Sequence, residues 1–311
     1  MTRYRIITNP IAGKGRALTQ IPLIEEELNK YNLDYEIVLT RYPWHAAELA
    51  QEAISEGWDV VVAAGGDGTA NEVLNGLMLA REYGANHTCM GLLPIGRGND
   101  FGFSMGIPAD TPSACRLLAQ GKYRLIDVGH IRGGLYPNGR YFGNGVGIGF
   151  DAVVGFIAAK SRLTGFLTYL VAALKTIALY YNAPKIELKL DDKTITDNFL
   201  MVSIMNGRRM GGGFMMAPNS EKDDGKFDLC LAYQMNRAQM LRTIPTFFNG
   251  TQYSQKNIGG ENSSLVEIRA IEGYLPVHAD GETICTEGDE LSVKIVSRQI
   301  ALICEYPEEA V

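Results

Sequence analysis

The sequence has few cysteines and histidines, and neither residue type is spaced for metal binding. None of the five cysteines forms a C-x-x-C pair, and the four histidines share no ligand spacing. An odd, scattered set of cysteines indicates neither a disulfide framework nor a zinc site. We therefore expect reduced thiols and a cytoplasmic protein. The cysteines are Cys89, Cys115, Cys230, Cys285 and Cys304, and the histidines are His45, His87, His130 and His278.

Basic residues are in deficit. The formal net charge is −6 at pH 7, and the sequence pI is about 5.4. Nucleic-acid-binding domains normally carry a basic excess or a basic stripe on one face. We therefore expect no nucleic-acid partner.

The chain shows no secretory signal pattern and no hydrophobic run long enough to span a bilayer. Its first ten residues, MTRYRIITNP, enter a strand pattern directly. The most apolar run, residues 165–181, is shorter than a full span and is interrupted by Lys175. We expect this run to form a helix packed on a sheet. Its flanks carry Lys160, Arg162 and Lys185, so docking on an anionic membrane surface is the alternative.

What the sequence does contain is a strand, a glycine turn and a helix within residues 59–74, DVVVAAGGDGTANEVL. The apolar run 60–64 is typical of a strand buried on both faces of a parallel sheet. Apolar residues then recur at three- and four-residue spacing from Ala70 onward, which predicts a helix. The intervening turn, Gly65–Thr69, presents main-chain N–H groups at a helix N-terminus, an arrangement that favours phosphate.

A glycine turn after a strand has two interpretations. It is an ordinary tight turn in many proteins, and this one lacks the Gly-Lys-Ser/Thr of a Walker A loop and the G-x-G-x-x-G of a dinucleotide site. The other interpretation is a phosphate-binding turn. Asp67 favours it, because a carboxylate in a phosphate-binding turn is usually explained by Mg²⁺ bound with a nucleotide.

Three further polar segments are expected at the same edge of the predicted sheet. Strands and helices alternate through the first half of the chain, and parallel strands place their ligands at their carboxyl ends. Those ends carry Asn9–Gly15, Thr40 and Pro94–Asp100 besides the Gly65–Thr69 turn. In the last of these turns Arg97 offers a cation for phosphate oxygens. Asn99 and Asp100 offer either oxygen ligands or a helix N-cap.

After Gly121 the pattern changes to short strands separated by turns, which predicts a second, mainly β domain with a sandwich fold. Three of its polar turns could belong either to a site or to plain hairpin tips: Gly211–Phe214, Glu221–Lys226 and Asp280–Glu282. We expect an α/β domain with a parallel sheet over residues 1–122 and a β domain over residues 123–297.

In combination and order, these segments resemble the diacylglycerol kinase catalytic-domain family, in particular its soluble bacterial lipid kinases, which also resemble sphingosine and ceramide kinases. The resemblance covers nearly the whole chain. It implies a fold like that of NAD kinases, with residues 298–311 returning to the first domain. The segments that carry it are NPIAGKG at Asn9–Gly15, GGDGTANEV at Gly65–Val73, PIGRGND at Pro94–Asp100, IDVG at Ile126–Gly129, GNGVGIGFD at Gly143–Asp151, GGGF at Gly211–Phe214, APNSEKDDGKFDL at Ala217–Leu229 and DGE at Asp280–Glu282.

The resemblance implies ATP- and Mg²⁺-dependent phosphoryl transfer to a lipid hydroxyl, with diacylglycerol as the expected acceptor, bound between the domains. Such an enzyme would belong to phospholipid biosynthesis and work at the inner face of the membrane. Together with the turns above, it gives these nucleotide-binding residues: Asn9, Pro10, Ile11, Ala12, Gly13, Thr40, Gly65, Gly66, Asp67, Gly68, Thr69, Asn71, Glu72 and Arg97.

The resemblance also implies the metal ligands and the catalytic base. The Mg²⁺ network would involve Asp67, Asp100 and Asp127. A second, structural Mg²⁺ would bind Asp224 and the main-chain oxygens of Glu221 and Lys226. The catalytic residues would be Glu282 as the base, Asp280 as the rival base, and Asp67.

One residue departs from the family pattern. The turn 94–100 usually has Thr after its Pro-x-Gly, whereas this chain has Arg97, so a hydroxyl contact is exchanged for a guanidinium. A nucleotide-binding regulator without turnover therefore stays open. An NAD kinase-like phosphotransferase stays open as well, because NAD kinases share the GGDGT turn and the two-domain fold. Expected partners are a lipid alcohol, a membrane surface reached transiently, and a second copy of the chain in a homodimer.

Overall fold

The computed structural model describes residues 2–82, 84, 88–161, 166–179 and 182–305. The chain divides into two compact units. Unit 1 comprises Met1–Asp127 with Arg298–Val311, and unit 2 comprises Val128–Ser297. The two divisions fall inside strands β5 (Tyr123–Gly133) and β15 (Glu290–Ile303), so each of these strands begins in one unit and ends in the other.

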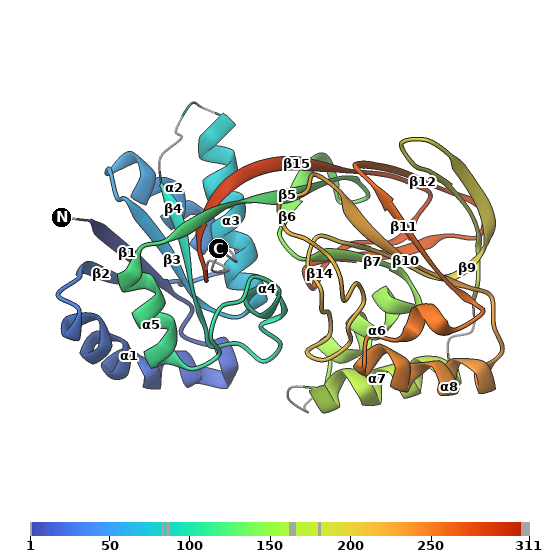
Figure 1. The fold of residues 1–311 in the computed structure, drawn as a ribbon, viewed down its shortest axis with the longest axis horizontal. Coiled ribbons are helices and arrows are strands. Elements are labelled where there is room, and N and C mark those ends of the chain that lie inside the picture. Colours follow the sequence, from blue (N-terminus) through green and yellow to red (C-terminus); the bar gives the residue numbers. More distant parts are fainter. Residues whose placement is uncertain (1, 83, 85–87, 162–165, 180–181, 306–311) are drawn as a thin grey trace, which may run out of the picture. The chain divides into compact units, whose positions relative to one another are not determined.

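Unit 1 is built on a parallel sheet with the strand order β2-β1-β3-β4, extended by the end of β15 (Figure 1). Every neighbouring pair in it is parallel, including Leu302 of β15 with Met90 of β4. The predicted α/β domain with a parallel sheet is therefore confirmed. The strands are β1 (Arg3–Thr8), β2 (Asp34–Leu39), β3 (Val60–Gly65) and β4 (Cys89–Pro94).

Helices connect these strands and cover the sheet. α1 (Ala12–Lys30) packs with α5 (Thr111–Gln120), and α2 (His45–Ser55) packs with α3 (Asp67–Glu82). The chain moves from β1 outward to β2 and then returns past β1 to β3. Because such crossovers are right-handed, this reversal places α1 and α2 on opposite faces of the sheet. All six residues of β3 are buried, as expected for a central strand.

Unit 2 is a sandwich of antiparallel strands. One sheet runs β14-β13-β7-β9-β10-β11, and the other contains β9-β8-β12-β15 with β5 and β6. The long strand β9 belongs to both sheets, pairing with β8 through residues 194–198 and with β7 through residues 201–205. The strands not yet bounded are β6 (Tyr136–Phe142), β7 (Gly145–Gly149), β8 (Lys185–Lys189), β9 (Thr194–Met205), β10 (Phe227–Tyr233), β11 (Ile258–Ser263), β12 (Leu265–Glu272), β13 (Leu275–Ala279) and β14 (Glu282–Gly288).

The two sheets of unit 2 enclose an aliphatic and aromatic core that includes Phe142, Phe199 and Phe227. This arrangement confirms the predicted β-sandwich domain. Three helices and one 3₁₀ turn complete the unit: α6 (Phe150–Ala159), α7 (Phe166–Leu179), α8 (Arg237–Phe248) and the turn Gln252–Ser254.

The cysteines are all free thiols, and four of the five are buried. Burial raises the pKa of Cys115 and Cys230 to about 12, so both stay protonated and unreactive at neutral pH.

Across the described residues, no helix has the length and apolar character that crossing a bilayer requires. The most apolar run forms α7, and Arg162, which flanks it, lies outside the described residues.

Candidate nucleotide and phosphoryl-transfer site

The glycine turn at the end of β3 is the first element of the site. β3 ends at Gly65, and α3 begins at Asp67, so a single residue separates strand from helix. Gly65 is required here, because a Cβ at this position would lie 2.4 Å from Thr69 Oγ1. The N–H groups of a helix's first turn have no intrahelical acceptor, and they favour an anion together with the helix dipole.

The turns after β1, β3 and β4 lie against one another at one edge of the sheet. Asn9 Nδ2 donates to Thr69 Oγ1 at 3.2 Å, which joins the first turn to the second. A Cβ on Gly13 would lie 2.4 Å from the Ile95 carbonyl oxygen, and a Cβ on Gly96 would lie 2.3 Å from Gly66 Cα. The backbones of the three turns therefore approach more closely than any side chain would permit.

The position of this cluster in the fold matches where α/β sheets bind ligands. The direction in which the chain adds strands to the sheet reverses after β2, because β2 lies on one side of β1 and β3 on the other. Crevices form at the carboxyl ends of strands at such a reversal. The Asn9 and Gly65–Thr69 turns follow β1 and β3 directly, so the prediction that they lie together is confirmed.

Two carboxylates stand at this edge. A Cβ on Gly98 would lie 3.0 Å from Asp67 Oδ2 and 3.3 Å from Asp100 Oδ2, so both side chains border the same glycine. Asp67 Oδ1 accepts the N–H of Phe101 at 3.0 Å, which ties α3 to the short helix α4 (Asp100–Ser104). Glycine amides beside paired carboxylates suit a polyphosphate with its Mg²⁺.

Asp127, the third predicted ligand, is fully buried in unit 1 and accepts the main-chain N–H of Arg298 at 2.7 Å. Over the described ranges, no group of three or more His, Cys, Asp or Glu side chains could hold a metal ion. The structure thus places Asp67 and Asp100 beside the same glycine, and ligation by Asp127 stays a prediction.

Asn99 holds its own turn instead of capping a helix. Its Oδ1 accepts the N–H of Gly96 at 2.8 Å, and its side chain makes no cap to α4. The N-cap alternative is therefore wrong for Asn99, and Phe101 N–H is bonded by Asp67 instead. The residue lies in the left-handed region at φ 53°, which asparagine tolerates better than most residues.

The remaining predicted nucleotide residues fall into exposed and internal groups. Arg97 and Ile11 are exposed at the turns, and Thr40 is half-buried at the end of β2. Glu72 accepts the N–H of Ala46 at 3.1 Å, at the start of α2. Asn71 is only 2% exposed and accepts from Asn75 Nδ2 within α3. Asn71 and Glu72 thus support the turn from within unit 1.

Replacing Gly96 by Ala tests the close packing of the turns. The added methyl would meet the Gly66 backbone, which cannot rotate away as a flexible side chain could. We expect a weaker nucleotide complex, with Kd for ATP raised about tenfold or more, and a free energy of unfolding lowered by about 1–3 kcal/mol. Isothermal titration and chemical denaturation measure the two effects. Gly106→Ala is the control. No atom lies within 4 Å of its Cβ position, so its expected cost is only the local backbone strain of an alanine at positive φ.

In unit 2 the structure distinguishes the two candidate bases. Asp280 lies in the turn between β13 and β14, with φ 47°, and its carboxylate accepts three main-chain N–H groups. The donors are Gly143 at 2.8 Å and Asn144 and Gly145 at 3.0 Å each. Glu282 begins β14 and is exposed. Asp280 thus fixes the loop before β7, whereas Glu282 presents its carboxylate to solvent.

Sequence reasoning did not identify a buried polar cluster beside this turn. Asp151, at the start of α6, accepts from Ser203 Oγ at 3.1 Å and lies 3.9 Å from His278 Nε2. Gly147 makes room for the cluster, since its Cβ would lie 2.4 Å from His278 Nε2 and 2.5 Å from Asp151 Oδ2. The GNGVGIGFD segment contains Gly147 and Asp151, but His278 lies far along the chain, so no local sequence pattern connects it to them.

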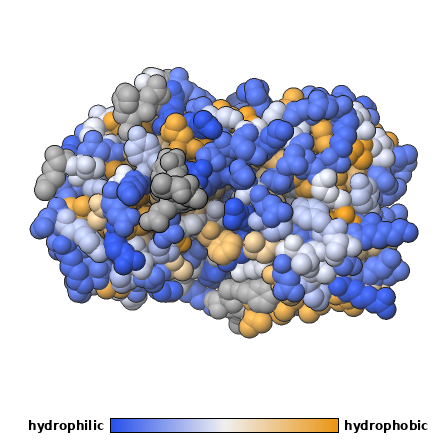
Figure 2. Space-filling view, viewed as in Figure 1, coloured by the Kyte–Doolittle hydropathy of each residue, from blue (hydrophilic) through white to orange (hydrophobic). Residues whose placement is uncertain are grey.

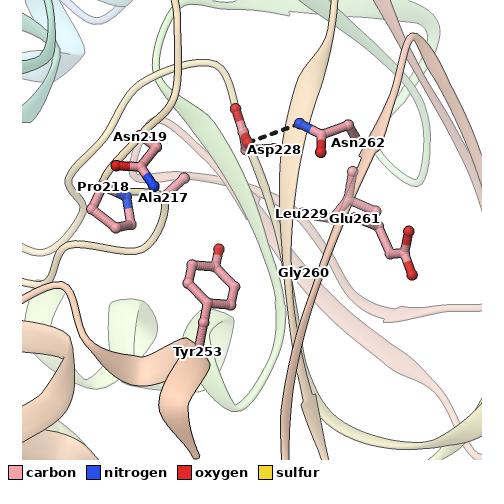
Figure 3. A pocket seen from close by; sticks show the side chains of 9 residues that line it. All are labelled: Ala217, Pro218, Asn219, Asp228, Leu229, Tyr253, Gly260, Glu261 and Asn262. Carbon is pink, nitrogen blue, oxygen red and sulfur yellow. Dashed lines mark hydrogen bonds between the residues drawn. The ribbon is translucent and has the colours of Figure 1, made fainter.

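The hairpin predicted to hold a structural Mg²⁺ lies at one end of β10. Asp224 Oδ1 accepts the N–H of Lys226 at 3.0 Å, and both residues are exposed. Nearby, a cavity of about 160 Å³ is lined by Asp228, Asn262 and Tyr253 among others (Figure 3). Burial raises the pKa of Asp228, and the neighbouring Asp224 and Glu221 raise it further. A cation at the hairpin would relieve this repulsion among carboxylates.

Family models match both units. Residues 3–131 match the diacylglycerol kinase catalytic domain. Residues 144–304, more than half of the chain, match the YegS C-terminal NAD kinase beta sandwich-like domain. The chain thus has a diacylglycerol kinase catalytic domain followed by a YegS C-terminal domain, and it belongs to the family that the second, longer match defines. The resemblance carried by the glycine turns and the DGE segment is thereby confirmed.

Relatives of this family align along nearly the whole chain. A diacylglycerol kinase of Mycobacterium tuberculosis is 27% identical over 299 residues, covering 94% of this chain and 93% of that protein. A diacylglycerol kinase of Bacillus subtilis is 28% identical over 285 residues, with 91% and 90% covered.

Solved structures have the same fold. A diacylglycerol kinase of Bacillus anthracis superposes with a TM-score of 0.71 at 21% identity, covering 100% of this chain and 98% of that chain. Yeast NADH kinase superposes with a TM-score of 0.51 at 10% identity, covering 99% and 84%. The kinase fold of the diacylglycerol kinase family therefore extends over both units.

Proposed function

We propose that this protein is an ATP- and Mg²⁺-dependent lipid kinase that phosphorylates the hydroxyl of a lipid alcohol, with diacylglycerol as the preferred acceptor and phosphatidic acid as the product. The observation that carries the proposal is the packing of three glycine turns around Asp67 and Asp100 at the strand reversal of unit 1. Kinase-family membership and relatives named diacylglycerol kinase support the choice of reaction and acceptor.

The residues of unit 1 suit the demands of phosphoryl transfer, which needs positioning and charge neutralisation more than covalent help. Main-chain N–H groups of the Gly65–Thr69 turn would hold phosphate oxygens, and the exposed Arg97 adds a cation at the same edge. Bound Mg²⁺ would neutralise charge on the transferred phosphoryl group. Asp67 and Asp100 would hold that ion.

Glu282 is proposed as the base that accepts the proton of the lipid hydroxyl. Its side chain is exposed at the start of β14. Asp280 supports it by holding the Gly143–Gly145 loop next to the start of β14. A base of this kind typically contributes about 10²–10⁴ to the rate.

The decisive assay supplies labelled ATP, Mg²⁺ and diacylglycerol in mixed micelles to the purified protein. We expect label in the lipid fraction, and its loss when EDTA removes Mg²⁺. A parallel screen with whole lipid extract would identify a different acceptor. Label in no lipid, combined with measurable ATP binding, would favour the regulator without turnover.

An NAD kinase-like activity is the alternative, and the shared fold with yeast NADH kinase is the observation behind it. The same assay with NAD in place of lipid separates the two activities, because the labelled product then stays in the aqueous phase.

We place the protein in phospholipid metabolism at the inner face of the membrane, with transient surface association.

A further inference from the structure

The loop between β2 and α2 places an aromatic pair at the surface of unit 1. It follows the end of β2 at Leu39 and leads into α2, which begins at His45. The rings of Tyr42 and His45 stack with their centroids 4.4 Å apart and their planes 26° from parallel. Tyr42 is 51% exposed, so His45 covers one face of its ring and the other face is open to solvent.

Both rings are held by hydrogen bonds. His45 Nδ1 accepts the N–H of Arg41 at 3.0 Å, which fixes the orientation of the imidazole. The Tyr42 hydroxyl donates to Glu48 in the first turn of α2. Trp44 adopts φ 72°, a left-handed conformation that is an outlier for a bulky side chain. Such conformations persist where the surrounding structure holds them, and they are frequent at ligand clamps.

The loop lies at the edge of the sheet where the glycine turns meet. At one end, the N–H of Thr40 donates to the carbonyl oxygen of Thr8, the last residue of β1, at 2.9 Å. At the other end, the N–H of Ala46 donates at 3.1 Å to Glu72, which follows the Gly65–Thr69 turn on α3. The loop is therefore tied at both ends to the segments that carry the glycine turns.

The distance between the aromatic pair and the turn after β3 suits a nucleotide. Leu39 of β2 and Ala64 of β3 both pair with Thr8 of β1, so the two strand ends are level and two strands apart. Neighbouring strands lie about 4.8 Å apart, which separates these ends by about 10 Å. In a nucleotide the ribose separates the base from the phosphates by a comparable span. One nucleotide could therefore place its phosphates on the Gly65–Thr69 turn and its base on the aromatic pair.

We propose that the base of a purine nucleotide stacks on the open face of Tyr42, and that His45 positions this ring from behind. This inference rests on the proposed function, because it assigns the base of the nucleotide whose phosphates the glycine turns would hold. A flat ring is a stacking partner for any base, and a purine offers it more area than a pyrimidine does. The surroundings are polar, since Figure 2 shows mainly hydrophilic residues over the face of unit 1 that it draws.

Nucleotide binding by the full chain, without lipid, tests this proposal separately from catalysis. The ligands are ATP, UTP and inorganic tripolyphosphate with Mg²⁺, and isothermal titration gives each Kd. We expect the wild type to bind ATP more tightly than UTP or tripolyphosphate. Tyr42→Leu should raise Kd for ATP about tenfold, as for one lost stack between a base and an aromatic ring, and leave Kd for tripolyphosphate unchanged. Tyr42→Phe should bind ATP like the wild type, because it keeps the ring.

Tyr31→Leu is the matched control. Tyr31 is 39% exposed in unit 1, but it lies between α1 and β2, at the amino ends of the strands. It should leave every Kd unchanged. Three results would overturn the stacking platform alone: an unchanged Kd for ATP in Tyr42→Leu, an equal rise for ATP and tripolyphosphate, or equal wild-type affinity for these two ligands. A wild type that binds neither ligand would overturn the proposed function as well.

Discussion

Replacing Asp67 by Asn is expected to lower the rate of phosphoryl transfer about a thousandfold while leaving the fold intact. The amide oxygen can still accept the N–H of Phe101, which Asp67 Oδ1 bonds at 3.0 Å, so the tie between α3 and α4 is kept. What is lost is the negative charge beside Asp100 and the glycine turns. Removing one preorganised electrostatic group from a catalytic site typically costs about 10²–10³ in rate.

Steady-state kinetics with varied Mg²⁺ measures the effect, and thermal melting checks the fold. Asp110→Asn is the matched control, because Asp110 also accepts a main-chain N–H at the start of a helix, that of Ser113 at 2.9 Å, but caps α5 instead of a site turn. It should leave turnover and stability almost unchanged. Undiminished turnover in Asp67→Asn would show that Asp67 takes no part in the transfer step.

The second large effect is expected at the DGE segment, where substituting the two carboxylates should have different consequences. Glu282→Gln should lower kcat about a thousandfold, the midpoint of the range for a general base, with an unchanged melting temperature because the side chain is exposed. Asp280→Ala should instead lower the free energy of unfolding by about 3 kcal/mol or more, since three main-chain N–H groups lose a charged acceptor.

Measuring kcat and chemical denaturation on the same preparations separates the two roles. Glu287→Gln serves as the control for Glu282, because Glu287 is exposed on the same strand, β14. It should keep both turnover and stability. If Glu282→Gln kept wild-type kcat, the base would have to be reassigned to Asp280.

The elements that the sequence predicts well are those with local signals. The buried run Val60–Ala64, the Gly65–Thr69 turn and the α3 periodicity are encoded within sixteen consecutive residues, so the strand, turn and helix of the candidate site follow from them. The antiparallel strands of unit 2 were predictable as a β domain for the same reason. β14 and β15 were not predicted, because the polar residues along them obscure the alternation.

The bonding partner of each polar side chain was not predictable from the sequence. Asn99 satisfies the rules for a helix N-cap, yet its side chain bonds back to Gly96 because it lies in the left-handed region. Glu72 sits in the nucleotide motif, yet it accepts the N–H of Ala46 from a helix 26 residues away. Local propensity gives the type of bond that such a side chain can make, but not the partner.

The sequence by itself determined the alternation of strands and helices, the glycine turns and the order of motifs that identifies the family, because each depends on residues a few positions apart. Only the tertiary structure decided that Gly66 and Gly96 meet backbone to backbone, that Asp67 caps α4, that Asp280 is a loop anchor while Glu282 is exposed, and that Glu72 ties the start of α2 to α3. These depend on which distant segments pack together, and burial then fixes which face of each element meets solvent.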